Sequence, residues 1–157
     1  MAEELNIISG SREEQYQSLY LQVSALLNGE TNRIANMANV CAALKEQFGF
    51  FWVGFYLVEG NELVLGPFQG TVACTRIARG KGVCGTAWQQ RQSIIVPDVN
   101  QFPGHITCSS LSRSEIVIPV FNPAGEIIAV LDVDSEFPDF FDETDRIWLE
   151  KFAALIL

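Results

Sequence analysis

The sequence predicts an α+β fold: one central antiparallel sheet with helices packed on one side and loops on the other. Apolar residues recur at helical spacing near both ends of the chain, and the strand-like segments between them form two hairpins. The chain has 157 residues, enough to bury a core without staples. We therefore expect residues 1–157 to form a single domain.

The first predicted helix covers residues 11–27. Ser11 followed by Glu14 is a capping-box pattern, and Asn28 with the glycine after it closes the element. The apolar and aromatic residues recur at helical spacing: Tyr16, Leu19, Tyr20, Val23 and Leu27.

A second helix begins at Thr31 and ends near Phe48 and Gly49. Its expected apolar face is Ile34, Met37, Ala38, Cys41 and Leu44. Because Cys41 falls within that stripe, we interpret it as a core residue.

The middle of the chain changes to strand patterns. Residues 50–58 are aromatic and β-branched and lead through a turn at 59–61 into 62–65, which predicts a hairpin. Residues 66–70 are expected to form a loop, and 72–77 a short strand.

A glycine-opened helix at 80–92 and a short strand at 93–96 come next, followed by a long loop at 97–114. A loop of this length in a compact domain is usually functional or disordered. Residues 115–121 and 126–133 then form the second hairpin across an Asn-Pro-Ala-Gly turn.

The last element is a helix that Asp142 caps and that runs to the end of the chain. Its expected apolar face is Ile147, Trp148, Phe152 and Leu155.

Charge and length exclude several classes of partner. The net charge of −9 and the isoelectric point near 4.5 argue against nucleic acid and against anionic membrane surfaces. Apolar runs stay short of the roughly 20 residues that cross a bilayer. The segment Met1–Asn6 lacks the basic and apolar regions of a signal peptide. We therefore expect a cytoplasmic protein, in which stable structural disulfides are rare.

Four cysteines in such a protein indicate core packing, metal binding or redox chemistry. No Cys-x-x-Cys pair occurs, and the only histidine, His105, lies three residues before Cys108. Zinc would need ligands gathered from scattered segments, so we expect neither a metal nor another cofactor.

Three of the cysteines lie in turn-rich, polar surroundings: Cys74, Cys84 and Cys108. Glycines flank Cys84 near a helix start, where backbone N–H groups favour a thiolate. Cys108 lies in the long loop among hydroxyl residues. The alternative, that these are ordinary buried thiols, fits poorly with three cysteines in such settings.

Three acidic residues interrupt apolar strands. Asp132 and Asp134 share one face of their strand because side chains alternate with a period of two, and Glu115 opens another strand. If the two strands pair, the three carboxylates converge at one end of the sheet. The alternative is that they face solvent on a one-sided sheet, and spacing does not decide between the two.

Trp52 and Tyr56 also share one strand face. Residues of this kind pack in a core or wall a ligand pocket. Gly54 between them leaves room for a close approach, or marks a bulge.

Short motifs cover most of the chain: LGPFQG at 65–70, ACTRI at 73–77, GKGVCG at 80–85, VPDV at 96–99, PGHITC at 103–108 and SEIV at 114–117, with WVGFYL at 52–57 and VLDVDS at 130–135. Together they resemble the free methionine-(R)-sulfoxide reductases, which are single GAF-domain proteins.

The resemblance implies a GAF-like fold with active-site loops on the side of the sheet away from the helices. It also implies reduction of free L-methionine (R)-S-oxide through a sulfenic acid and an intramolecular disulfide, recycled by thioredoxin or a similar dithiol, and it suggests a homodimer. The main alternative is a GAF module that binds a ligand or senses redox state without turnover; such modules normally report to an attached output domain, which we do not expect in this chain.

The resemblance also assigns roles by residue. Cys108 matches the catalytic cysteine, Cys74 the principal resolving cysteine and Cys84 a further cysteine that can enter a disulfide. The acids Glu115, Asp132 and Asp134 match active-site acids, and Trp52 and Tyr56 match pocket aromatics. On this basis Glu115 or Asp134 protonates the sulfoxide oxygen, Asp132 pairs with the substrate amine and Trp52 packs on the methyl group.

Overall fold

A single curved antiparallel sheet organises the chain. The computed structural model describes residues 3–157; Met1 and Ala2, the start of the segment examined for a signal peptide, lie outside the described residues. The sheet has six strands in the order β3-β2-β1-β6-β5-β4. Their bounds are β1 Trp52–Glu59, β2 Glu62–Gln69, β3 Arg76–Ala78, β4 Ile94–Val96, β5 Ser114–Phe121 and β6 Ile127–Ser135.

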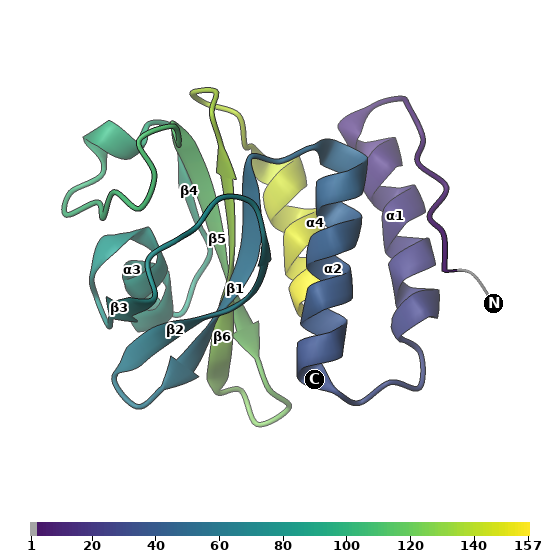
Figure 1. The fold of residues 1–157 in the computed structure, drawn as a ribbon, viewed down its shortest axis with the longest axis horizontal. Helices are drawn as coiled ribbons and strands as arrows, with labels where there is room; N and C mark the ends of the chain where they lie inside the picture. The colour runs from purple at the N-terminus through teal and green to yellow at the C-terminus, as the bar shows by residue number, and fades with distance from the viewer. Residues whose placement is uncertain (1–2) are drawn as a thin grey trace.

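Helices pack on both faces of this sheet, but the longer ones all lie on one face. Helices α1 (Arg12–Leu27), α2 (Arg33–Phe48) and α4 (Glu143–Ala153) lie together on one side (Figure 1). The short helix α3 (Gly82–Gln90) and the connections around it lie on the other side (Figure 1). The predicted α+β layout is therefore confirmed, with α3 as an addition on the loop side.

Capping side chains define the ends of the long helices. Ser11 accepts a hydrogen bond from the Glu14 N–H and Glu14 returns one, so the capping box predicted for α1 is present. Asn32 caps α2, one residue after the predicted start, and Gly49 ends it in the left-handed conformation.

The two faces of the sheet carry separate hydrophobic cores. The larger core joins the sheet to α1, α2 and α4 and includes Cys41, which confirms its interpretation as a core residue. The smaller core lies under α3 and includes Trp52, Tyr56 and Cys84. The polar site described below is thus set into the smaller core.

Helix α4 is tied to α1 through the buried carboxylate of Asp145. The Tyr16 hydroxyl donates to one Asp145 oxygen at 2.6 Å, and the Arg12 guanidinium donates to the other at 2.6 Å. The Asp142 N–H donates to the same carboxylate within the capping box of α4. This network holds α1 against α4, because every partner belongs to α1 or to the start of α4.

The structure corrects several predicted boundaries. Strand β2 runs through Gln69, so the loop expected at 66–70 is wrong for all but its last residue: Phe68 and Gln69 pair with β1, and Gly66 and Pro67 lie at the register shift between them and Leu65. The strand expected at 72–77 is confined to Arg76–Ala78, and the long loop ends before Ser114, which already belongs to β5. The 97–113 loop also contains a short 3-10 helix, η1 (Val99–Gln101).

In α2 and α4 the buried face differs in part from the expected apolar face. Ile34 and Ala38 on α2 are exposed, as is Ile147 on α4. Polar residues take part in the buried faces instead, namely Asn36 and Gln47 on α2 and Asp145 on α4. These residues are hydrogen-bonded, which is why burial is tolerated.

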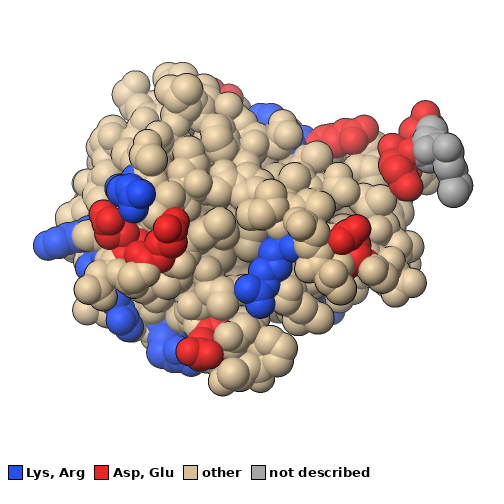
Figure 2. Space-filling model, turned by 60° about the horizontal axis from the view of Figure 1, so that its bottom comes forward, with Lys and Arg blue, Asp and Glu red and all other residues tan. Residues whose placement is uncertain are grey.

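On the face shown in Figure 2, acidic and basic side chains form small groups separated by uncharged surface. Among residues 3–157, no helix is long and apolar enough to cross a membrane.

Replacing Asp145 tests the network between α1 and α4. We expect Asp145→Asn to lower the free energy of unfolding by about 2–3 kcal/mol, because it breaks an ion pair that is buried on the Asp145 side and one-third exposed on the Arg12 side. Urea unfolding measures the change. The control is Asp139→Asn at an exposed position, expected to stay within about 0.5 kcal/mol. Equal midpoints for the two variants would contradict the assignment.

Candidate active site

Strand register brings the three interrupting acids together. Glu115 on β5 lies directly opposite Asp134 on β6, and Asp132 lies opposite Val117. On the other side of β6, Trp52 of β1 is opposite Asp134 and Gly54 is opposite Asp132. Directly opposed residues of an antiparallel pair point to the same face. The convergence of the carboxylates is thus confirmed, and it occurs on the face opposite α1, α2 and α4.

Burial of the acids excludes the alternative that they face solvent on a one-sided sheet. Glu115 and Asp132 are each 6% exposed, and Asp134 is partly exposed. Burial raises the pKa of Glu115 well above its ordinary value, and the neighbouring Asp132 and Asp134 charges raise it further. Burial likewise raises the pKa of Asp134 well above its ordinary value, with Asp132 adding to the effect.

Asp132 differs from its two neighbours. Burial raises its pKa too, but the Glu115 side chain and the Cys84 thiol act in the opposite direction. The pKa of Asp132 is still raised overall, but it is raised less than those of Glu115 and Asp134, so Asp132 is the most readily ionised acid of the three. Such a cluster offers both a proton donor and a negative charge within one small volume.

Cys84 lies in the first turn of α3 and is buried against this acid cluster. Burial raises the pKa of the Cys84 thiol well above its ordinary value, and the nearby carboxylates, Asp132 first, raise it further. The expectation that the start of the helix favours a Cys84 thiolate is wrong, because desolvation and negative neighbours outweigh the helix end.

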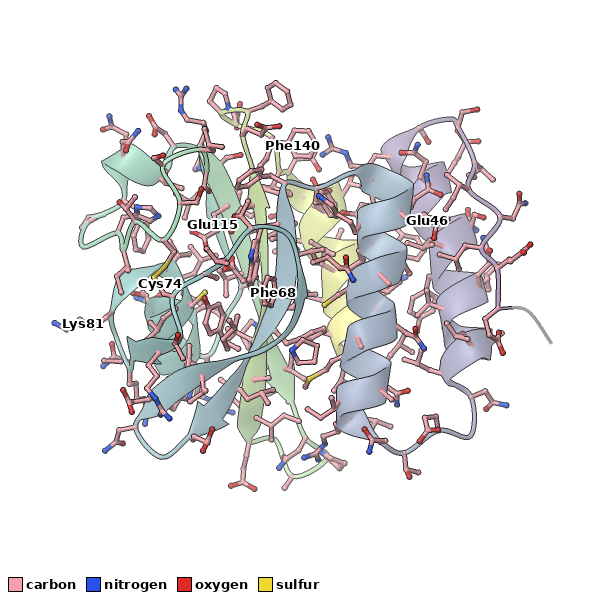
Figure 3. The ribbon with its side chains drawn as sticks, viewed as in Figure 1. Glu46, Phe68, Cys74, Lys81, Glu115 and Phe140 are labelled. Carbon is pink, nitrogen blue, oxygen red and sulfur yellow. A yellow bond between two sulfur atoms is a disulfide. The ribbon has the colours of Figure 1, made fainter. Side chains whose placement is uncertain are left out.

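Cys74 and Cys108 form a disulfide across the mouth of the site, with their Cα atoms 5.4 Å apart. Cys74 lies between β2 and β3, and Cys108 lies in the 97–113 loop, where it is exposed. Figure 3 shows the disulfide at Cys74 on the same side of the sheet as Glu115 and away from the three packed helices. The site therefore places a solvent-accessible disulfide over buried acids.

Trp52 forms one wall of the site within an aromatic stack. Its ring lies between Phe68 and Tyr56, with centroids 5.2 Å and 6.0 Å away, and its indole N–H donates to the Thr71 carbonyl. A Cβ on Gly54 would lie 2.5 Å from the Trp52 ring. Both expectations for Gly54 are confirmed, because the β1–β2 register also shifts between Gly54 and Tyr56.

The cavity over the acids is narrow. It has a free volume of about 50 Å³, well below the range of about 300–1,000 Å³ typical of small-molecule sites. All the residues singled out above line it: Trp52, Tyr56, Cys84, Cys108, Glu115, Asp132 and Asp134, with Cys74 bonded to Cys108 at the mouth. Trp52 and Tyr56 thus serve the smaller core and the cavity at once.

The structure adds residues that the sequence did not assign. His105 lies with Nε2 3.8 Å from a Glu115 oxygen, and burial lowers the pKa of its imidazole. Lys81, just before α3, lines the rim. The position of His105 three residues before Cys108 was the available signal, whereas nothing in the spacing pointed to Lys81.

The raised pKa of Glu115 predicts a pH-dependent change in stability. The folded state binds this proton more tightly than the unfolded state, so the stabilisation is complete below the ordinary pKa of 4.5 and is lost as pH rises through the folded-state pKa. Glu115→Gln stays neutral at all pH values. We therefore expect its melting temperature to exceed that of the parent chain at about pH 8, with the difference shrinking towards about pH 4.5.

The matched control is Glu136→Gln, an exposed position just after β6. Calorimetry across the same pH series should show no such trend for it. A Glu115→Gln difference that is independent of pH would contradict the burial argument.

Comparison with known proteins places this geometry in a family. The GAF domain family matches residues 35–156. "GAF domain-containing protein A" of Dictyostelium discoideum is 63% identical over 99% of this chain and 99% of its own length. The free methionine-R-sulfoxide reductase of Escherichia coli (strain K12) is 46% identical over 92% of this chain and 87% of its own.

A solved relative shares the fold almost completely. The free methionine-R-sulfoxide reductase from Neisseria meningitidis, determined in complex with its substrate, superposes with a TM-score of 0.95 at 48% identity, covering 99% of this chain and 93% of that one. The chain belongs to the GAF-domain family of free methionine-R-sulfoxide reductases.

Proposed function

We propose that this protein reduces free methionine-(R)-sulfoxide to methionine with Cys108 as the nucleophile. The observation that carries the proposal is the accessible Cys74–Cys108 disulfide over a buried cluster of acids with raised pKa values. Relatives that are named for this activity match nearly the whole chain.

The chemistry proceeds in two balanced steps. The Cys108 sulfur attacks the sulfoxide sulfur while the sulfoxide oxygen is protonated, giving methionine and a Cys108 sulfenic acid. The Cys74 thiol then attacks that sulfenic acid, forming the disulfide and releasing water. The sulfoxide is reduced by two electrons and the two thiols are oxidised to one disulfide.

The acid cluster supplies the proton. A sulfoxide sulfur is electrophilic only when its oxygen is protonated or strongly hydrogen-bonded. Glu115 is the more deeply buried of the two acids with strongly raised pKa values, so we assign it as the principal donor, with Asp134 beside it. The ionised Asp132 is left to pair with the substrate ammonium group.

The start of α3 suits the carboxylate of a free amino acid. Gly82, Val83 and Cys84 form its first turn and line the cavity, and the Lys81 side chain does not cap the helix. Backbone N–H groups at a helix start bind anions, and the exposed Lys81 adds a positive charge at the rim. An ammonium site and a carboxylate site a short distance apart select a free amino acid over a residue within a peptide.

The positions of the cysteines indicate different roles for their thiols in the proposed reaction. Cys108 is exposed, whereas Cys84 is buried among carboxylates that disfavour its thiolate. This contrast supports Cys74 as the first resolving thiol and Cys84 as a slower alternative. A dithiol reductant such as thioredoxin then restores the thiols by exchange at the exposed disulfide.

An assay with free sulfoxides tests the proposal. We expect purified protein with dithiothreitol to release methionine from the free (R)-sulfoxide and not from the (S) form or an N-acetylated analogue. Cys108→Ser should reduce turnover to the background rate, because it removes the nucleophile. The matched control is Cys41→Ala, a thiol in the helix-side core.

Three results would overturn parts of this assignment. Full turnover by Cys108→Ser would show that Cys108 is not the nucleophile. Equal rates on the N-acetylated analogue would show that the enzyme is not specific for the free amino acid. Release of no methionine from either isomer would favour a GAF module that binds a ligand or senses redox state without turnover.

The pose of Trp52 gives a second kinetic test. Gly54→Ala places a Cβ 2.4 Å from the Phe68 Cβ and 2.5 Å from the Trp52 ring, so both members of the aromatic stack must shift. We expect KM for the sulfoxide to rise about tenfold, equivalent to about 1.4 kcal/mol, with kcat little changed. The control is Gly66→Ala, whose Cβ would meet Leu57 and the Phe55 carbonyl instead. A similar KM increase in both variants would show a general packing effect and remove the role of Trp52.

A further inference from the structure

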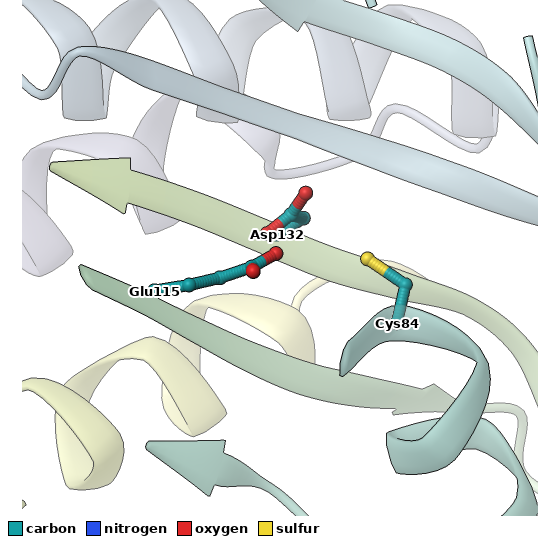
Figure 4. Close-up of side chains that lie close together, drawn as sticks. All are labelled: Cys84, Glu115 and Asp132. Atoms are coloured by element: carbon teal, nitrogen blue, oxygen red, sulfur yellow. The ribbon is translucent and has the colours of Figure 1, made fainter. Parts of the chain in front are cut away.

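Three side chains from separate elements converge with the geometry of a metal site. The Cys84 sulfur on α3 and carboxylate oxygens of Glu115 on β5 and Asp132 on β6 lie within 4.8 Å of one another. Figure 4 shows the sulfur directed towards the two carboxyl groups. From the sequence, zinc was not expected because its ligands would come from scattered segments, and the fold gathers such segments here.

An unsatisfied oxygen in the cluster points to a missing partner. Asp132 is buried, and its Oδ1 atom has no partner among residues 3–157 apart from the protons that the Glu115 carboxyl and the Cys84 thiol carry themselves. If those two groups lose their protons, the buried carboxylate needs a cation in their place, because an unpaired buried charge is costly. Among the lining residues Lys81 is the one Lys or Arg, and it extends outwards to solvent (Figure 3).

In the disulfide form the cavity has room for a small ion but not for an amino acid. About 50 Å³ holds an ion with a few waters, since one water needs about 10–15 Å³ by this kind of measure. An amino acid of the size of methionine sulfoxide needs a larger space, so it requires the mouth of the site to open. A small cation does not.

We propose that the chain binds a thiophilic divalent cation, zinc, through Cys84, Glu115 and Asp132, none of which takes part in the disulfide, so that both the oxidised and the reduced forms offer the same ligands. Metal–ligand bonds of about 2.0–2.3 Å place tetrahedral ligands about 3.4–3.6 Å apart, so the side chains need to close by about 1 Å. Zinc displaces the thiol proton to solvent and leaves its fourth position for water. The sulfur ligand selects zinc over magnesium and calcium.

Zinc at this position regulates the proposed reductase, and this consequence rests on the function proposed above. The metal occupies both the carboxylate assigned to the substrate ammonium group and the principal proton donor. It therefore competes with free methionine sulfoxide and inhibits reversibly, with recovery on addition of a chelator.

Cobalt titration of the oxidised protein isolates the binding step. In that form Cys74 and Cys108 are locked in the disulfide, so Cys84 and Cys41 are the remaining thiols. We expect Co²⁺ to bind one equivalent per chain with a thiolate-to-cobalt charge-transfer band, and Zn²⁺ to displace it. Millimolar Mg²⁺ should leave the band unchanged.

Variants assign the ligands. Cys84→Ser should abolish the band, while Cys41→Ala, the control thiol in the opposite core, should keep it. Asp132→Asn keeps the thiol and the shape, and should weaken Co²⁺ binding about tenfold or more; it also covers the case in which Cys84→Ser does not fold. No saturable band in the parent chain, or a full band in Cys84→Ser, overturns the site.

A single-turnover assay tests inhibition with protein that has been reduced and then freed of the added reductant, each variant measured against its own uninhibited rate. We expect Zn²⁺ to slow the parent chain and EDTA to restore it, with a loss of zinc sensitivity in Cys84→Ser. Equal sensitivity in Cys84→Ser would place the metal on Cys108 and overturn the inhibitory role. A cobalt band without any sulfoxide turnover would instead refute the proposed function and leave the metal site standing.

Discussion

The site depends on the pairing register of β1, β6 and β5. In that register Trp52, Asp134 and Glu115 form one row across three strands, with Asp132 in the next row on the same face. A slip of one residue would turn these side chains into the helix-side core. The register is held by that core, because the alternate residues of the same strands pack against α1, α2 and α4. The packing of apolar side chains on one face of the sheet thus fixes the positions of the acidic side chains on the other face.

This arrangement also explains how the chain tolerates buried acids. Desolvated carboxylates oppose folding unless they hold protons or find partners, and the raised pKa values of Glu115 and Asp134 favour their neutral, protonated forms. The larger core and the Asp145 network stabilise the same sheet without contributing to the site. Because stability comes from the helix side, the residues under α3 are free to be selected for reactivity.

Much of the fold was predictable from local patterns, and the site only in part. Capping signals and period-two strands gave the helices and the two hairpins, and the even spacing of Asp132 and Asp134 gave their shared face. The convergence of Glu115 with them depended on strand pairing, which periodicity leaves open. The thiolate expected at Cys84 failed because a helix-end effect is local, whereas desolvation comes from strands distant in sequence. The loop expected at 66–70 failed because Gly66 and Pro67 are accommodated at a register shift, after which Phe68 and Gln69 pair with β1 again.

The disulfide form couples redox state to access. The Tyr56 hydroxyl donates to the Cys74 carbonyl, so the backbone of one disulfide partner is held against the pocket wall. The other partner, Cys108, belongs to the 97–113 loop, which is joined to the sheet at its two ends. When the bond between them breaks, the loop loses its covalent tie to the rim while Tyr56 still holds Cys74 in place. In the proposed reaction, the disulfide that forms at the end of a turnover therefore also adds a covalent tie between this loop and the rim of the site.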